Sequence, residues 1–262
     1  MKRLILVVVF VLGTVQPAVG EISQRVVDIP TRAGVTQRFL LLIPPTPRAA
    51  AILFAGGHGG LQITSSGDFG WGKNNFLVRT RELFADKGMM VVVVDAPSDR
   101  QRAPYLDDFR QTPEHVTDIQ AVIAWIRSQA QVPVWLIGTS RGTQSAAHVA
   151  IELAAGTVGP DGLVLTSTIL SDNKGRPVPD MPVQKLKLPV LVVHHEQDGC
   201  KKCLFSDMPK LMNRLDGVAR KELQTFRGGD NQGDPCKALA HHGFNGIELN
   251  VVNRIAAWIV AK

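Results

Sequence analysis

The fold of this chain is decided by the stretch Val134-Trp135-Leu136-Ile137-Gly138-Thr139-Ser140-Arg141-Gly142. Its first four residues are apolar and predict a buried strand, and residues 143–151 after it predict a helix. A serine on a sharp strand-to-helix turn requires small neighbours two positions away on each side, because a Cβ there would clash. Gly138 and Gly142 meet this requirement. We therefore expect Ser140 at the carboxyl edge of a sheet, with the N–H of Arg141 directed at a developing oxyanion.

Predicted strands and helices alternate along the rest of the chain. The expected strands are 24–30, 36–43, 50–54, 89–94, 134–137, 163–166, 189–195 and 222–226, and the expected helices are 76–85, 114–126, 143–151, 204–215 and 247–259. Most of these strands are apolar throughout, which indicates that helices cover both faces of the sheet. The sequence therefore predicts an α/β fold with an open, mostly parallel, twisted sheet of about eight strands. Ligands bind such sheets at the carboxyl ends of strands, where Gly57, Ser140 and Asp198 fall.

The first 20 residues have the pattern of a secretory signal peptide. Lys2-Arg3 is a positive start, residues 4–12 form a short apolar run, and Ala18-Val19-Gly20 is a small-residue cleavage site. The apolar run is too short for a membrane anchor, which needs about 20 residues. We expect export to the periplasm or the medium after cleavage near Gly20, with no stable membrane span afterwards. Residues 21–262 are then a single domain without a large lid insertion.

The charge of the chain does not indicate a nucleic-acid partner. The formal net charge is +6, of which Lys2 and Arg3 contribute two, and the other basic residues are scattered among acidic ones. The glycine-rich segment 56–60 lacks the spacing of either nucleotide-binding loop motif. We expect a small-molecule partner, and the oligomeric state stays open.

An acid and a base follow Ser140 in the order serine, acid, histidine. A serine nucleophile needs a base within hydrogen-bond reach and an acid that orients the base. Asp198 lies just past a buried strand, and His242 lies in the loop before the last helix. With the turn at Ser140 and the glycine-rich segment, residues 24–260 resemble the α/β-hydrolase superfamily, in particular exported, poorly characterised serine hydrolases of the dienelactone-hydrolase and esterase-like type.

This resemblance implies a role for each matching residue. Ser140 is the expected nucleophile, His242 the general base and Asp198 the orienting carboxylate. The expected oxyanion donors are the backbone N–H groups of Arg141 and His58, with Gly57 allowing close approach. Neither a metal nor an organic cofactor is implied.

Two of these roles have rivals in the sequence. His241 adjoins His242, although His242-Gly243-Phe244 matches the superfamily's pattern of histidine, small residue and aromatic residue. Asp172 follows the preceding strand, where some hydrolases carry their acid. The other polar candidates are expected to be structural: His194 and His195 at a strand end, Asp95 as a turn cap, His115 on the surface and His148 in packing. A metal cluster of His194 and His195 with Glu196 and Asp198 lacks the spacing of a helical site.

The three cysteines, Cys200, Cys203 and Cys236, all lie near the residues around Asp198 and His242. In an exported protein, a Cys200–Cys236 disulfide would tie the loop of the acid to the loop of the base. Such a pair also resembles a pattern in some exported α/β-hydrolases. A Cys203–Cys236 bridge is the competing pairing, and the remaining cysteine has no account.

The resemblance implies an exported serine hydrolase that cleaves an ester, a thioester or an amide through an acyl-enzyme. The rival hypothesis is a non-catalytic binding protein that keeps the same fold. No long lid is evident, so we expect an open or shallowly covered pocket for a small acyl substrate. Residues 65–75, with Phe69 and Trp71, and the proline-rich residues 171–185 are expected to line its entrance.

Overall fold

The computed structural model describes residues 20–172 and 174–261, so the predicted signal peptide lies outside the described residues except for Gly20. The strands are β1 (Ser23–Arg32), β2 (Val35–Ile43), β3 (Ala49–Phe54), β4 (Met89–Val94), β5 (Val134–Thr139), β6 (Gly162–Thr166), β7 (Val190–His195) and β8 (Lys221–Phe226). The α-helices are α1 (Phe76–Arg79), α2 (Arg81–Asp86), α3 (Pro113–Gln129), α4 (Gly142–Glu152), α5 (Met208–Arg214) and α6 (Glu248–Val260). Short 3₁₀ turns cover Ser98–Arg100, Val178–Asp180, Val183–Lys185, Phe205–Asp207 and His241–Gly243.

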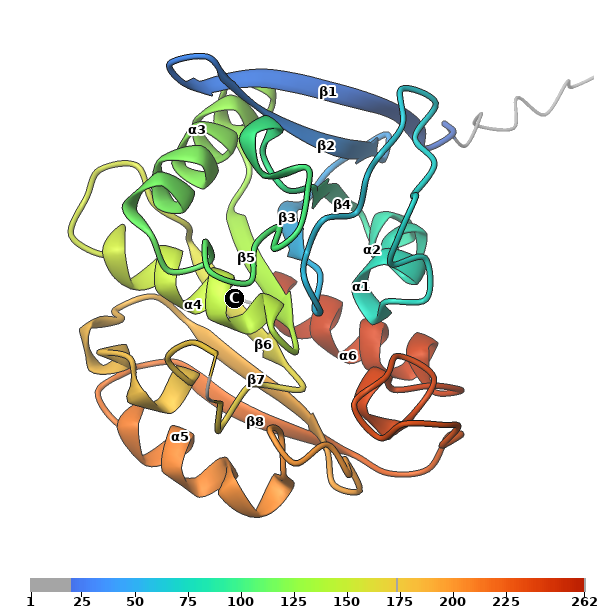
Figure 1. The fold of residues 1–262 in the computed structure, drawn as a ribbon, viewed down its shortest axis with the longest axis vertical. Helices are drawn as coiled ribbons and strands as arrows, with labels where there is room; N and C mark the ends of the chain where they lie inside the picture. Colours follow the sequence, from blue (N-terminus) through green and yellow to red (C-terminus); the bar gives the residue numbers. More distant parts are fainter. Residues whose placement is uncertain (1–19, 173, 262) are drawn as a thin grey trace, which may run out of the picture.

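All of these strands belong to one sheet, with the order β1-β2-β4-β3-β5-β6-β7-β8 (Figure 1). The β1–β2 hairpin is antiparallel and β2 pairs antiparallel with β4, whereas the pairings from β4 through β8 are parallel. The chain reverses its direction across the sheet between β4 and β5, which flank β3. The carboxyl ends of β3 and β5 therefore lie side by side, and this is where an open α/β sheet binds its ligands.

Helices cover both faces of the sheet, which explains why the strands are apolar throughout. Alternate strand residues face one side, where α3, α4 and α5 pack, and their neighbours face the other, where α1, α2 and α6 pack. In β5, for example, Leu136 belongs to the first core and Trp135 and Ile137 to the second. Every residue of the central strands β3 to β7 is thus buried, as a parallel sheet requires, whereas the edge strand β1 is largely exposed.

The predicted helix over residues 76–85 forms as two short helices that meet at Thr80. The Thr80 hydroxyl donates to the carbonyl of Phe76 at 2.7 Å, and Thr80 has φ −99° and ψ 4°. A hydroxyl that bonds back to the preceding turn offers the backbone an alternative partner, and this type of contact bends helices. The sequence pattern correctly predicted the buried face, but not this break.

The proline-rich residues after Ser171 contribute to the core. Val178 and Val183 are fully buried, and the two 3₁₀ turns that hold them pack against α4, while the first also packs against α5. The apolar residues between the prolines explain this placement, because they find partners on two neighbouring helices. This segment is a structural layer over the sheet.

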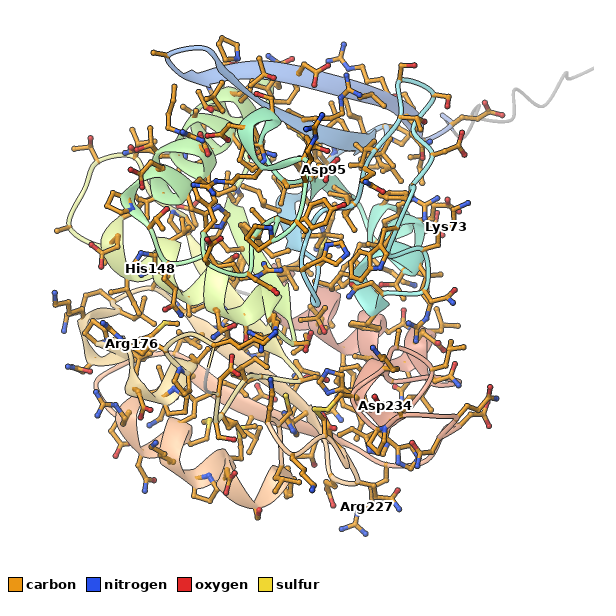
Figure 2. The ribbon with its side chains drawn as sticks, in the orientation of Figure 1. Lys73, Asp95, His148, Arg176, Arg227 and Asp234 are labelled. Atoms are coloured by element: carbon orange, nitrogen blue, oxygen red, sulfur yellow. A yellow bond between two sulfur atoms is a disulfide. The ribbon has the colours of Figure 1, made fainter. Side chains whose placement is uncertain are left out.

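Asp95 anchors the segment that follows β3. It is buried just past the end of β4 (Figure 2), and its carboxylate accepts hydrogen bonds from the N–H groups of Leu61, Gln62, Ile63 and Ala96 at 2.7–3.1 Å. Asp95 was expected to cap its own turn, and it also binds residues 61–63 of another segment. Asp95 thus ties the segment that follows β3 to the end of β4 and keeps the glycine-rich segment beside these two parallel strands.

No helix among residues 20–172 and 174–261 is long and apolar enough to cross a membrane.

Candidate active site

Ser140 occupies the sharp turn between β5 and α4. Its backbone is in the left-handed region, with φ 51°, which costs a non-glycine residue about 1–3 kcal/mol. The turn is held by the Ser140 N–H, which donates to the Thr166 carbonyl at 3.0 Å, and by Thr143, whose N–H and hydroxyl both donate to the Ser140 carbonyl. The expected turn is therefore present, and neighbouring elements maintain its strained serine.

The glycines around Ser140 are required by close backbone contacts. A Cβ on Gly142 would lie 2.0 Å from the carbonyl oxygen of Phe54, and one on Gly138 would lie 2.5 Å from the carbonyl oxygen of Gly142. Both distances are far below any real Cβ contact. The start of α4 consequently lies directly against the end of β3, which places Ser140 beside the glycine-rich segment.

Asp198 and His242 form a buried hydrogen-bonded pair. Asp198 Oδ2 accepts from His242 Nδ1 at 2.8 Å, and its Oδ1 accepts from the Cys200 N–H at 2.9 Å. His242 Nε2 is buried and has no hydrogen-bond partner among the described residues. Because the carboxylate fixes the proton on Nδ1, Nε2 is left as an acceptor. No hydrogen bond joins it to Ser140 here, and catalytic hydrogen bonds of ligand-free sites are often long.

The rival histidines have other partners. His241 Nδ1 lies 3.2 Å from the Gln197 carbonyl oxygen, and its ring stacks on His195 at 4.3 Å between ring centroids. His194 Nε2 is bonded to the Cys203 carbonyl at 2.7 Å and His195 Nε2 to the Gly228 carbonyl at 2.8 Å. Burial lowers the pKa of both His194 and His195. Of the four, only His242 bonds the carboxylate of Asp198 within hydrogen-bond distance.

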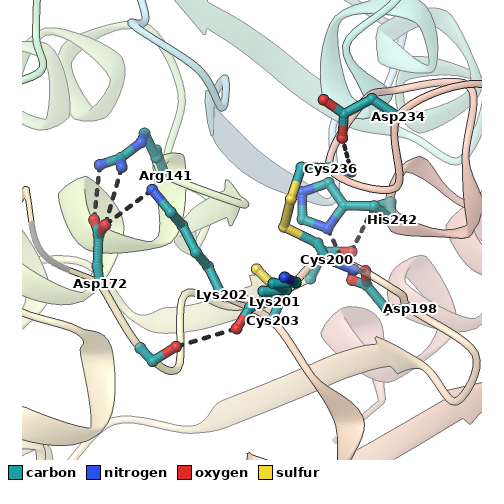
Figure 3. The surroundings of a disulfide bond; sticks show 12 residues. Arg141, Asp172, Asp198, Cys200, Lys201, Lys202, Cys203, Asp234, Cys236 and His242 are labelled. Atoms are coloured by element: carbon teal, nitrogen blue, oxygen red, sulfur yellow. Dashed lines mark hydrogen bonds and ion pairs between the residues drawn. A yellow bond between two sulfur atoms is a disulfide. The ribbon is translucent and has the colours of Figure 1, made fainter.

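Asp172 is bound to two cations, Arg141 and Lys202, and lies apart from the Asp198–His242 pair (Figure 3). Arg141 donates two hydrogen bonds to its carboxylate, at 2.8 and 3.1 Å, and Lys202 Nζ lies 3.1 Å from Oδ1. Burial raises the pKa of the Asp172 carboxyl, but the hydrogen bonds from Lys202 and Arg141 outweigh it and leave the pKa lowered. Asp172 therefore stays ionised and fixes the side chain of Arg141.

A disulfide joins Cys200 to Cys236 and so links the loop after Asp198 to the loop before His242 (Figure 3). Asp234 caps the second loop, because its carboxylate accepts from the Cys236 N–H at 2.8 Å. Cys203 is the free cysteine and is buried against Cys200 and Ile169. Burial raises its pKa well above the ordinary value, so the thiol stays protonated and acts as a core residue.

The glycine-rich segment after β3 passes close to Ser140. A Cβ on Gly56 would lie 2.9 Å from Ser140 Cβ. The N–H groups of Gly57, His58 and Arg141 donate to no acceptor among the described residues. Free N–H groups from two segments that meet at a serine are the arrangement that stabilises an oxyanion.

The His58 ring itself is directed into an aromatic stack. It lies between Trp71, at 3.8 Å between centroids, and Tyr105, at 4.3 Å. Its Nδ1 accepts from the Gly60 N–H at 3.1 Å, and burial lowers its pKa. The ring is therefore neutral and fixed, and it shapes the segment while its backbone remains next to the candidate site.

Arg110 holds the same segment from behind and was not singled out by its sequence pattern. It is buried, and its guanidinium donates to the carbonyls of Ala55 and Gly57 at 3.2 and 3.0 Å and to the Ser145 hydroxyl at 2.9 Å. Burial lowers its pKa to about 9, from 12.5, so it remains a cation at neutral pH. Since a peptide's C=O and N–H point in opposite directions, Arg110 turns the next N–H, that of His58, away from itself.

A pocket of about 480 Å³ lies over Ser140. Gly57, Ser140, His242 and Cys236 line it together with Lys237, Ala238, Gly243, Thr139 and residues 70–76, which include Trp71, Lys73 and Asn75. Lys73, which lines the pocket, and Asp234, two positions before the lining residue Cys236, are labelled in Figure 2. Trp71 therefore lines the pocket as expected. Phe69 is instead buried in the core, and the described residues of the proline-rich segment do not line this pocket.

His115 lies in the core, so the expected surface position was wrong. It is 2% exposed between Phe54 and Phe109, and burial lowers its pKa to about 3. Neither ring nitrogen has a hydrogen-bond partner among the described residues. Positions 115, 119, 122 and 126 share one face of α3, and this periodicity was the signal that would have predicted its burial.

Comparisons with known proteins identify the fold. No protein-family model matches the chain, and no curated protein matches it by sequence. Among solved structures, dienelactone hydrolase from Anabaena variabilis is 14% identical with a TM-score of 0.62, over 92% of this chain and 98% of that one. An esterase from Pyrococcus furiosus is 14% identical with a TM-score of 0.62, over 95% and 96%.

A third similar structure is an α/β serine hydrolase without a lid from Xanthomonas campestris, 16% identical with a TM-score of 0.55, over 95% of this chain and all of that one. These likenesses extend over nearly the whole chain, although the sequences have diverged far. The chain therefore has the α/β-hydrolase fold, and its structural neighbours are esterases and other hydrolases.

Removing the disulfide is expected to lower the free energy of unfolding by about 3–4 kcal/mol, because the bridge closes a loop across 36 positions of sequence. The double variant C200A/C236A should show this loss in urea denaturation, compared with the wild type under non-reducing conditions. Peptide mapping without reductant should recover Cys200 linked to Cys236, with Cys203 alkylated only after unfolding. A bridge that contains Cys203 would contradict the pairing.

Proposed function

We propose that this chain is an exported serine hydrolase that cleaves a small ester through an acyl-enzyme, with Ser140 as nucleophile, His242 as general base and Asp198 as the orienting acid. Thioesters and amides are the other acyl substrates of the same chemistry. The observation that carries the proposal is the 2.8 Å bond between Asp198 and His242: the Nε2 of His242 has no partner among the described residues, and His242 lines the same pocket as Ser140.

In the first half of the reaction, Ser140 Oγ attacks the acyl carbon while His242 Nε2 takes its proton. The C=O electron pair moves to the oxygen, which accepts hydrogen bonds from the N–H groups of Arg141 and His58, next to Gly57. Asp198 stabilises the imidazolium through the Nδ1 hydrogen bond. Collapse of the tetrahedral intermediate breaks the bond to the leaving group, which takes the proton from His242.

In the second half, water attacks the acyl-enzyme. His242 Nε2 takes one proton from the water, the new tetrahedral intermediate collapses, and the proton returns to Ser140 Oγ as the carboxylic acid leaves. Neither half requires a redox change or a cofactor. Two contacts support these reaction steps. The disulfide holds the loop of His242 near Ser140, and Arg110 holds the glycine-rich segment near it.

The pocket favours a small substrate. Its volume of about 480 Å³ lies at the lower end of the range for small-molecule sites. The residues that line it come from the loops around Ser140, and Trp71 is the largest apolar group at its rim. We expect short acyl chains to be preferred over long lipid chains.

The alternative is a binding protein that uses this pocket without turnover. A fluorophosphonate probe separates the two hypotheses, because it bonds covalently only to an activated serine. We expect the purified mature protein to be labelled, the Ser140→Ala variant not to be labelled, and the exposed-site control Ser171→Ala to be labelled like the wild type. Equal labelling of Ser140→Ala, or no labelling of the wild type, would overturn the hydrolase proposal.

The choice of acid is tested by two matched substitutions. Asp198→Asn should lower kcat for a p-nitrophenyl ester by about 10³–10⁴-fold, because the amide no longer orients and stabilises a charged His242. Asp172→Asn should keep kcat within tenfold, since Asp172 binds Arg141 and Lys202. The reverse ranking in initial-rate measurements would make Asp172 the acid.

Export is proposed from the pattern of residues 1–20, and the disulfide is compatible with an oxidising compartment. Expression of the full chain in a bacterium should give a periplasmic or secreted product. Intact-mass measurement should fit a chain that starts at Glu21. A cytoplasmic product that retains Lys2-Arg3 would contradict export.

A further inference from the structure

The side-chain amide of Asn75 borders the space beside Ser140 where the glycine-rich segment passes. A Cβ built on Gly56 would lie 3.4 Å from Asn75 Nδ2 and 2.9 Å from Ser140 Cβ. The amide nitrogen and the serine thus border the same methyl-sized space. Asn75 also lines the pocket that Ser140 and His242 share. The amide therefore lies in the same pocket as Ser140, on the side of the glycine-rich segment.

The orientation of the Asn75 amide is fixed by a hydrogen bond to its oxygen. Asn75 is the N-cap of α1, and its Oδ1 accepts from the Leu77 N–H at 3.2 Å. With the oxygen committed to the helix, the NH₂ group is left on the side of Gly56. Its two N–H groups donate to no acceptor among the described residues. Because Asn75 is half-buried and lines the pocket, this donor is open to an acceptor that arrives with a ligand.

The charges of the pocket favour a negative oxygen at this point. No aspartate or glutamate is among the residues that line the pocket, whereas Lys73 and Lys237 are. The cation of Arg110 lies behind the same segment, bonded to the Gly57 carbonyl. A negative oxygen in this pocket would thus face two lining lysines and no lining carboxylate.

We propose that the Asn75 side-chain amide is a third donor to the oxyanion, next to the backbone N–H groups of Arg141 and the glycine-rich segment. This inference rests on the proposed hydrolase function. As the bond from Ser140 Oγ to the acyl carbon forms and the C=O electron pair moves to oxygen, Asn75 Nδ2 donates a hydrogen bond to that oxygen. No proton is transferred from the amide. The bond strengthens as charge develops, so it lowers the barrier more than it strengthens substrate binding.

Two variants separate the role of the Asn75 NH₂ group as a donor from the role of its oxygen as the N-cap of α1. Asn75→Ser keeps an N-cap hydroxyl but removes the NH₂ donor, and Asn75→Asp keeps the cap oxygen but replaces the donor with a charge. Both variants should lower kcat for a p-nitrophenyl ester by about 10²–10³-fold, with KM within threefold of the wild type. Affinity for a trifluoromethyl ketone, which forms the oxyanion, should fall in parallel. Asn213→Ser, on the exposed face of α5, is the matched control.

The outcomes distinguish this inference from the function on which it rests. A fall in kcat and in ketone affinity with an unchanged melting temperature supports the donor role. If the wild type turns over and Asn75→Ser keeps kcat within threefold, the donor role is overturned alone. A loss of kcat that follows a loss of melting temperature also overturns it, because the residue would then act as a cap. A wild type that neither turns over nor reacts with a fluorophosphonate overturns the proposed function and this inference together.

Discussion

The contact between the start of α4 and the end of β3 is the constraint on which the rest of the site depends. Gly142 lies so close to the Phe54 carbonyl that any side chain there would overlap it. Because β3 and β5 are adjacent parallel strands, this contact brings the turn of Ser140 against the glycine-rich segment. A larger residue at position 142 would separate the serine from every donor on the β3 side. The strained backbone of Ser140 is tolerated because Thr166 of β6 and Thr143 of α4 hold it through hydrogen bonds.

Around that contact, buried polar side chains and a disulfide hold the loops in place. Asp95 holds residues 61–63, just past the glycine-rich segment, through three N–H groups, and Arg110 holds the start of the segment through two carbonyls. Asp172 fixes the Arg141 side chain, and the Cys200–Cys236 bridge joins the loops of Asp198 and His242. Loops at a sheet edge are ordinarily the mobile part of such a fold. Here the glycine-rich segment and the loops of Asp198 and His242 each have such an anchor.

Much of this arrangement could be predicted because it rests on local rules. The glycines around Ser140, the apolar strands and the order of Ser140, Asp198 and His242 are all features of short sequence windows. The break at Thr80 and the burial of His115 were missed, since each depends on how a helix meets its neighbours. Residues 171–185 were expected at the pocket because prolines predict loops, but the valines between them find partners in the core. Arg110 gave no sequence signal, and Asn75 was expected at the pocket only as part of the loop over residues 65–75, because isolated arginines and asparagines are common on surfaces.

The sequence by itself determined the α/β architecture with its mostly parallel sheet, since strand hydrophobicity and turn glycines follow from backbone geometry alone. It also supplied the serine and the acid as candidates just past the ends of strands, and the histidine as a candidate in the loop before the last helix. Only the tertiary structure decided which partners they find. It paired Asp198 with His242 while Asp172 bound Arg141, and it joined Cys200 to Cys236. The reason is physical: pairings between residues distant along the chain depend on distances between strand ends, and those distances are set by the order of strands in the sheet.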